Sequence, residues 1–469
     1  MTSGRIRIGR WCFPTLLLLT GSGCWTMPVA ATRDTVSILL EQRTGQSLSA
    51  STPGQIELPP GVVLESGLTE DAVVAVALRN NALFQELLVD LGIARSDLIT
   101  AGLLPNPEGL YFFSVPDKPF KYAFEIPLEA IWLRPIRIRG ADRESNRVAD
   151  RLVQTGLDLI RDTRLAFADT VLARERVRIA EEAIRLRGRI AEVAKNRLDA
   201  GDATPQEAAT ARIDALQATQ DAARIRLEIP LAEERLRNLM GIPTYRGPLD
   251  LVANTLPECL QLDVDALWRD AIATRPDAVS AREAIAAAEA RLEFARLGWV
   301  RLLGVGDASS GRNTGHEFGP ALRFTIPVFN RNQGNIARAE ADLERSVRQE
   351  QTVRNQIVLD VQRAHLLYRQ ACAEFDVLKT KVRPEVETAI GRGEAAFKEG
   401  NVNYLIVLET TRQLLDTMLR EAILSGDLRR TWAELERSVG QRLGANETAD
   451  PLRTPGRFAS PASPSGKTP

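Results

Sequence analysis

The side chains that most often carry chemistry are scarce in this chain. It has two histidines, His316 and His365, and four cysteines in 469 residues. His316 lies in a polar stretch of Gly, Ser and Asn, and His365 lies beside two leucines in a helical pattern. Neither has a Cys, Asp or Glu at the spacing of a metal site or a catalytic triad, and the sequence has no glycine-rich phosphate loop. We therefore expect no enzyme activity, no cofactor and no metal centre.

The cysteines are too few for a disulfide framework. Cys12 and Cys24 lie near the N-terminus, which leaves Cys259 and Cys372. These two could pair in an oxidising compartment, because disulfides persist there. The expectation that we favour is that both are unpaired and serve as small apolar side chains.

The N-terminus has the features of an export signal. Three arginines precede a short apolar run at 11–20 that holds four consecutive leucines. Gly21-Ser22-Gly23-Cys24 then resembles a lipoprotein processing site, so residues 1–24 are predicted to be a signal peptide and Cys24 is the candidate for lipidation. Cleavage after Ala31 is the alternative. Either reading predicts an exported protein.

Charge and composition indicate long helices. Lys and Arg number 60 and Asp and Glu number 61, so the net charge is −1 and no nucleic-acid partner is expected. Ala, Leu, Arg and Glu dominate long stretches, as they do in coiled coils. Heptad spacing recurs in two places, from Leu165 to Val193 and from Ile357 to Val382.

The sequence also repeats itself after about 200 residues. Phe124-Glu125-Ile126-Pro127-Leu128 recurs as Phe324-Thr325-Ile326-Pro327-Val328. The glycine pair Gly201 and Gly400, and the leucine pair Leu236 and Leu435, are each 199 positions apart. This period is far longer than that of a solenoid repeat, so we interpret it as a duplicated half-molecule.

The duplication divides the chain into six segments. The signal peptide is followed by an N-terminal arm (25–66), expected to be poorly packed, and by repeat 1 (67–241). A linker (242–262) leads to repeat 2 (263–441), and a Pro- and Ser-rich tail (442–469) is expected to be disordered. Each repeat is predicted to run helix, two strands, long helix and returning helix.

Aromatic residues cluster in the predicted strands. In repeat 1 the strands are expected within 108–128, and in repeat 2 at 299–305 and 318–329 with a polar loop at 306–316. A lipid-facing band needs such aromatic residues, although amphipathic hairpins packed on helices would also explain them. The residues expected to face lipid are Tyr111, Phe112, Phe113, Tyr122 and Trp299.

Each long helix is predicted to turn back through a short tip. Gly201 suits a left-handed C-terminal cap, and Thr204-Pro205-Gln206-Glu207 forms a capping box with proline at the first helical position. In repeat 2, Gly400 takes the first role and Asn403 is the N-cap. Pro384 predicts a kink in the second long helix only.

These features together resemble the TolC-type outer membrane factors, the exit ducts of tripartite efflux and type I secretion systems. The resemblance rests on the order of elements, on Leu103-Leu104-Pro105-Asn106-Pro107, on the Ile-Pro pairs that end strands, and on the tip glycines. Residues 326–334 resemble the branch that serves heavy-metal RND pumps.

The resemblance implies a mainly α fold with a small β part. Duplicated helical hairpins would form a coiled-coil tunnel, and four strands per chain would contribute to a twelve-stranded barrel shared by three subunits. The physics agrees, because an open four-stranded sheet would leave backbone groups unpaired in hydrocarbon. The chain would therefore be a homotrimer in the outer membrane of a Gram-negative bacterium, in contact with lipid and extending into the periplasm.

The implied function is passive conduction of substrate from an inner-membrane RND pump and a periplasmic adaptor, with heavy-metal cations as the expected cargo. Glu207 and Glu409 match the family's gate acids, although Glu207 is also the capping-box acid. Two alternatives stay open, a periplasmic coiled-coil adaptor and the duct of a type I secretion system. The adaptor-contacting tip positions would be Arg197, Leu198, Gly201, Thr204, Gly400, Val402 and Asn403.

Overall fold

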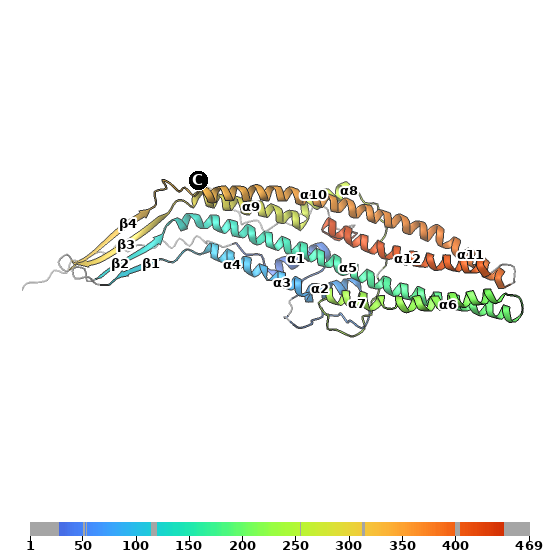
Figure 1. The fold of residues 1–469 in the computed structure, drawn as a ribbon. Coiled ribbons are helices and arrows are strands. Elements are labelled where there is room, and N and C mark those ends of the chain that lie inside the picture. The colour runs from blue at the N-terminus through green and yellow to red at the C-terminus, as the bar shows by residue number, and fades with distance from the viewer. Residues whose placement is uncertain are drawn as a thin grey trace, which may run out of the picture.

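The computed structural model describes residues 28–49, 52, 54–113, 120–253, 255–311, 315–398 and 404–444. The molecule is elongated, with the strands at one end and the ends of two pairs of long helices at the other (Figure 1). The predicted signal peptide with Cys24, and the predicted tail beyond Gly444, lie outside the described residues.

The strands form one antiparallel sheet in the order β1-β2-β3-β4. These are β1 (Glu108–Phe112), β2 (Phe120–Pro127), β3 (Leu302–Gly311) and β4 (Gly315–Phe324). β2 pairs with β3, so the two repeats meet in the middle of the sheet, and β1 and β4 are left as open edges. The predicted loop at 306–316 is wrong over most of its length, because residues 306–311 extend β3 and residues 315–316 begin β4.

Repeat 1 folds around a single helix that runs most of the molecule's length. α5 (Glu129–Asp199) has 71 residues, or roughly 105 Å at 1.5 Å per residue. The chain then turns and returns along it as α6 (Pro205–Ile225) and α7 (Glu228–Leu239).

Repeat 2 is built in the same way but with an interruption. α9 (Pro276–Leu297) leads to β3, and α10 (Gln333–Val377) follows β4. A π-helical turn, η1 (Leu378–Val382), then precedes α11 (Arg383–Lys398), and α12 (Tyr404–Val439) returns. Near Pro384, where a kink was predicted, the structure has a π turn just before the proline, which has no N–H to donate to the preceding turn.

The shorter helices pack on the long helices of both repeats. α5 contacts α1 (Arg33–Thr44), α2 (Glu70–Asn80), α3 (Ala82–Leu88) and α4 (Asp90–Gly102), and α10 contacts α8 (Val264–Thr274). Asn81 ends α2 and caps α3, so the one helix predicted at the start of repeat 1 is three helices. Within the described ranges no single helix is long and apolar enough to cross a membrane, although α2 and the α3–α4 segment meet that test together across a 54° bend.

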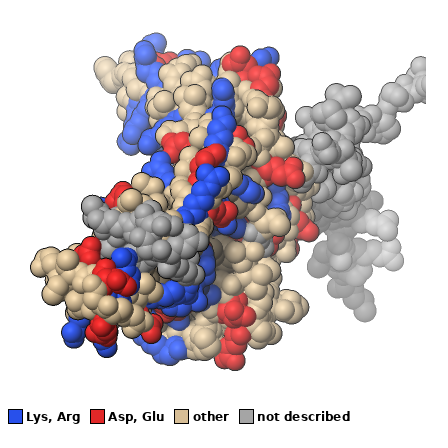
Figure 2. Space-filling view, turned by 90° about the vertical axis from the view of Figure 1, so that its right-hand side faces the viewer, with Lys and Arg blue, Asp and Glu red and all other residues tan. Residues whose placement is uncertain are grey.

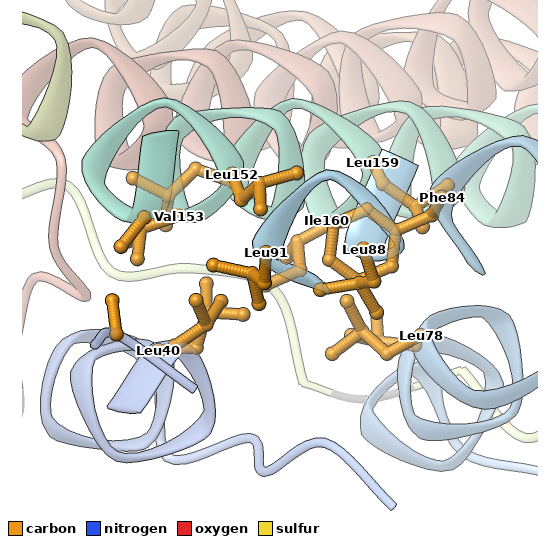
Figure 3. Close-up of a cluster of buried hydrophobic side chains, with 14 residues drawn as sticks. Leu40, Leu78, Phe84, Leu88, Leu91, Leu152, Val153, Leu159 and Ile160 are labelled. Carbon is orange, nitrogen blue, oxygen red and sulfur yellow. The ribbon is translucent and has the colours of Figure 1, made fainter. Parts of the chain in front are cut away.

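The N-terminal arm is not poorly packed. Thr32 forms a capping box at the start of α1, and Val36 and Leu40 are fully buried. They join a cluster in which Leu78, Phe84 and leucines of α3, α4 and α5 face one another (Figure 3). The Ser- and Thr-rich composition concealed this helix, because its apolar positions are few but lie on one face.

Equivalent glycines close the two repeats. Gly241 and Gly440 both adopt positive φ, 70° and 85°. A Cβ on Gly241 would lie 2.1 Å from the Asn80 carbonyl oxygen, and one on Gly440 would lie 2.7 Å from Cγ of Arg275. Each returning helix therefore ends against the break between the two short helices of its own repeat, and only glycine fits there.

The linker between the repeats is fastened to α10. Cys259 and Cys372 form a disulfide with 5.8 Å between their Cα atoms, so the expectation that they are unpaired is wrong. One turn earlier on α10, the Tyr368 hydroxyl donates to the Glu258 carbonyl at 2.5 Å and accepts from the Leu260 N–H at 3.0 Å. Two kinds of contact therefore hold the linker at one place.

Buried ion pairs join the repeats near the middle of the molecule. Arg164 of α5 is hydrogen-bonded to Glu436 of α12, and both side chains are buried. Burial lowers the pKa of Arg164, but Glu436, Glu70 and Asp71 outweigh that effect and raise it overall. Burial also raises the pKa of Glu70, against the opposing effect of Arg164. Removing either member of such a pair would leave an uncompensated charge.

Candidate channel site: strand faces and hairpin ends

One face of the sheet is apolar. Side chains alternate along a strand, so the register places Tyr111, Tyr122 and Phe124 on the same face. Tyr111 and Phe113 meet edge to face with ring centroids 5.3 Å apart, and so do Tyr122 and Phe124 at 6.2 Å. Gly109 lies opposite Phe124, and a Cβ there would lie 3.5 Å from its ring, so the glycine leaves room for the ring. Phe124 is 53% exposed, so an apolar neighbour is needed to cover this face of the sheet.

The other face carries charge. The Lys121 ammonium lies 3.2 Å from the Asp307 carboxylate, and the Arg323 guanidinium lies 2.7 Å from Glu125. These pairs link β2 to β3 and, across β3, to β4. A sheet with one apolar and one charged face suits a wall between lipid and water.

Phe112 does not lie on the apolar face. It pairs with Lys121 in the register, and the Lys121 ammonium lies 5.7 Å from its ring centroid. The prediction grouped it with Tyr111 and Phe113, but three consecutive strand residues cannot share a face. Tyr111 and Tyr122 lie on one face, and Phe113 contacts Tyr111; that these residues face lipid stays a prediction.

Exposed aromatic residues continue past the sheet where strands meet helices. Trp299 lies between α9 and β3, Trp132 lies in the first turns of α5, and Phe329 lies between β4 and α10. All three are exposed. Arg134 and Arg137 lie just beyond and donate to the carbonyls of Gly102 and Leu103. Aromatic rings followed by cationic groups are typical of a membrane boundary.

The tip of the first hairpin has the predicted geometry. Gly201 has φ 85°, and the Asp202 N–H donates to the Arg197 carbonyl at 2.8 Å. The Thr204 hydroxyl accepts from the Glu207 N–H at 3.2 Å, and the Glu207 carboxylate accepts from the Thr204 N–H at 3.1 Å. Arg197 and Leu198 are half-buried in the last turn of α5. Figure 2 views the molecule from this end and shows basic and acidic side chains intermixed.

The second tip is only partly described. Gly400, Val402 and Asn403 lie outside the described residues, so their predicted roles stay predictions. Glu409 lies just beyond them on α12 and is exposed, with Gln413 donating to it at 3.4 Å. Each candidate gate acid thus accepts a hydrogen bond, and the one to Glu207 in the cap is shorter than the one to Glu409.

In the part of the chain that the structure describes, no three His, Cys, Asp or Glu side chains are grouped to hold a metal ion. His365 is buried in α10, and burial and the charge of Arg369 lower its pKa against a hydrogen bond with the Leu262 backbone.

The elements form an arc with two open edges. Near the hairpin ends, α6 packs on α5, α5 on α12, and α12 on α11 (Figure 1). Near the sheet, α4 packs on α5, α5 on α9, and α9 on α10. The edge formed by β1, α4 and α6 comes from repeat 1, and the edge formed by β4, α10 and α11 comes from repeat 2.

Comparison with known proteins decides the family. The family model described as "Outer membrane efflux protein" matches residues 120–242 and 267–441, which is well over half of the chain.

The chain belongs to the outer membrane efflux protein family.

Two curated relatives carry metal-efflux names. The chain is 25% identical over 385 residues to the "Cobalt-zinc-cadmium resistance protein CzcC" of Cupriavidus metallidurans, covering 80% of this chain and 90% of that protein. It is also 25% identical over 280 residues to the "Cation efflux system protein CusC" of Escherichia coli O157:H7, covering 57% of this chain and 59% of that protein.

Solved structures share the fold. A crystal structure of CusC aligns with a TM-score of 0.68 at 19% identity, over 83% of this chain and 96% of the other. VceC from Vibrio cholerae aligns with a TM-score of 0.66 at 15% identity, over 80% of this chain and 96% of the other. The fold is thus the mainly helical TolC-like fold, in which the barrel forms on trimerisation.

Family membership makes the chain an outer membrane efflux component rather than a periplasmic adaptor. Proteins of this family are trimeric channels that work with adaptor and RND pump partners, and efflux channels are not enzymes. The sequence predictions of family, fold, efflux function and outer membrane location are therefore confirmed.

Sequence reasoning missed the charged face of the sheet. Lys121, Glu125 and Arg323 alternate with aromatic or apolar residues, and that period of two is readable in the sequence. It would also have separated Phe112 from its neighbours. Asp307 falls in the stretch predicted to be a loop, so its pairing with Lys121 could not be anticipated.

Proposed function

We propose that three copies of this chain form a duct that carries heavy-metal cations from an RND pump and its adaptor through the outer membrane. The open edges of the arc support this most directly. The outer edges of β1 and β4 have no partner strand among the described residues, which is untenable in lipid unless another copy supplies one. The names of CzcC and CusC support metal cations as cargo.

The sheet would form the membrane wall of the duct. Tyr111, Phe113 and Tyr122 would face lipid together with Phe124, and Trp299 would lie at the periplasmic boundary. The paired charges of the other face would line the water-filled interior. Lipidation of Cys24 would add a second attachment to the same membrane.

The hairpin ends would meet the adaptor and close the duct. Arg197, Leu198, Gly201 and Thr204 surround the first turn, and Gly400, Val402 and Asn403 would surround the second. A mixed-charge surface suits a contact that must be made and released (Figure 2). Three copies of Glu409, with Glu207 in second place, would form an acidic ring that favours cations at the entrance.

Metal tolerance tests this function. The gene is deleted and restored on a plasmid, and growth is measured in zinc, cobalt and cadmium salts and, as a control, in antibiotics. We expect the deletion to lower tolerance to the metals several-fold and to leave antibiotic tolerance unchanged. Sensitivity to antibiotics alone, or loss of a secreted polypeptide with normal metal tolerance, would contradict metal cations as the cargo.

A further inference from the structure

Because of the duplication, residues of one returning helix have equivalent positions in the other. The tip glycines Gly201 and Gly400 are 199 positions apart, and so are Leu236 and Leu435 near the ends of those helices. The same offset makes Leu216 of α6 the counterpart of Leu415 of α12, and Ala223 the counterpart of Ala422. Residues that are equivalent in a duplication are expected to have equivalent neighbours.

In repeat 2 these positions are buried by repeat 1. Leu415 is 7% exposed and lies with Ala422 in a cluster with Ile179 of α5. Ala183 and Leu186, on the same side of α5, pack against that cluster. Through this contact the long helix of repeat 1 packs against the returning helix of repeat 2.

In repeat 1 the counterparts are exposed. Leu216 is 61% exposed and Ala223 is also exposed. They lie on the side of α6 opposite to α5, because Ala211, Ala218 and Ala222 are the positions that α6 buries. Leu216 is followed at helical spacing by the exposed Leu227 and Leu231. The described residues of this chain do not cover that stripe.

The receiving side also has an exposed counterpart. Ala183 corresponds to Val382 by the same offset. One turn further from the tip, Ile179 corresponds to the buried Leu378 by the same offset. The exposed Val377 comes just before Leu378, and a π turn spans five residues where an α turn spans four. The π turn therefore keeps Val377 and Val382 on one face, where they are 45% and 39% exposed. They line an apolar groove with Leu378 and Leu424.

We propose that Leu216 and Ala223 of one copy pack into the groove at Val377 and Val382 of the next copy. This proposal rests on the trimer proposed above and gives one of its interfaces residue by residue. The internal contact supplies the pattern, since Leu415 and Ala422 meet Ile179 and Ala183 in the same way. The helix directions agree as well. In the internal contact α12 runs away from its hairpin tip and α5 runs toward its own. In the proposed contact α6 likewise runs away from its tip and α11 runs toward its own.

A second copy fits these surfaces better than an unrelated partner. The stripe and the groove lie on opposite edges of one arc, so a head-to-tail contact uses both and leaves neither exposed once the ring closes. The same two edges carry β1 and β4, which need partner strands from the same neighbour. An adaptor docking on either surface would leave the other uncovered.

Crosslinking tests the contact. Leu216→Cys and Val382→Cys are introduced together into the full-length chain, membranes are oxidised, and the product is separated with and without reductant after heating. We expect most of the chain to shift to a covalent, reductant-sensitive trimer. Two control pairs should give little of it: Ala218→Cys with Val382→Cys, whose first residue faces α5, and Leu216→Cys with Ala395→Cys, which lies nearer the tip.

The outcomes separate this contact from the trimer itself. A heat-dissociable trimer that crosslinks through the Ala395 pair rather than the Val382 pair would overturn the proposed register and leave the duct intact. Absence of any trimer in unheated samples of the parent would overturn both. Leu216→Arg gives a second test without oxidation, because it should lower the temperature at which the trimer dissociates, whereas Gln217→Arg beside it should not.

Discussion

Removing the disulfide between Cys259 and Cys372 should loosen the contact between the linker and the long helix of repeat 2. The bridge closes a loop with a sequence separation of 113 residues. In the chain-entropy model a loop of about 100 residues is worth about 4.7 kcal/mol, and measured values are typically ~2–4 kcal/mol. We therefore expect Cys259→Ser with Cys372→Ser to lower the free energy of unfolding by about 2–4 kcal/mol.

Tryptophan fluorescence can follow this loss close to the bridge. Trp432 packs on Tyr368 with ring centroids 5.3 Å apart, and Tyr368 holds the linker residues on either side of Cys259. Guanidinium unfolding is compared for the parent and the double serine variant at equal protein concentration, since oligomers gain apparent stability by mass action. Cys259 is exposed, so reductant should shift the parent toward the variant and leave the variant unchanged.

Tyr368→Phe is the matched control for the second attachment. It removes the hydroxyl that both donates to Glu258 and accepts from Leu260, but keeps the ring and the disulfide. Because both attachments hold the same stretch of linker, their effects should not simply add. The reasoning is refuted if the double serine variant and reductant both leave the unfolding midpoint unchanged, which would mean that the two thiols are unpaired in the native protein.

Two further predictions concern the membrane wall and the entrance. Phe124→Arg places a charge on the apolar face of the sheet and should reduce trimer yield in the outer membrane, at a cost of roughly 2–4 kcal/mol near mid-membrane. Phe112→Arg is the control, because it adds the same charge on the charged face of the sheet, opposite Lys121, and equal losses would contradict the assignment of faces. Glu409→Gln should lower cation preference in planar-bilayer conductance, while Glu258→Gln, which removes an equal charge from the linker, should not. Unchanged selectivity in Glu409→Gln would mean that this acid does not line the entrance.

Local signals in the sequence predicted most of the elements correctly. Gly201 and the box from Thr204 to Glu207 each depend on neighbours within a few residues, so the tip could be read without the fold. The Ile-Pro pairs marked the ends of β2 and β4 to within a few residues. Pro384 marked an irregularity, but its form depends on the hydrogen bonds of the preceding turn and was not predictable.

The wrong predictions have a different cause. Each concerns a feature that depends on contacts between residues far apart in the sequence. Pairing of Cys259 with Cys372 requires the linker to fold back onto α10. Burial of Leu40 requires helices of repeat 1 that follow it in the chain. The polar stretch at 306–311 becomes a strand because β2 pairs with it residue by residue, from Gly306 opposite Phe124 to Ser310 opposite Phe120.

The duplication explains why the interface between copies resembles the interface inside one. Within the chain, the second strand of repeat 1 pairs with the first strand of repeat 2, as β2 with β3. The strands left without a partner are the second strand of repeat 2, β4, and the first strand of repeat 1, β1. The equivalent pairing would therefore join β4 of one copy to β1 of a neighbouring copy. The helices follow the same rule, since α5 receives α12 inside the chain and α11 lacks an equivalent partner among the described residues. One rotation about a common axis satisfies the strands and the helices together, so a variant that breaks the helical contact at Leu216 should also weaken the barrel.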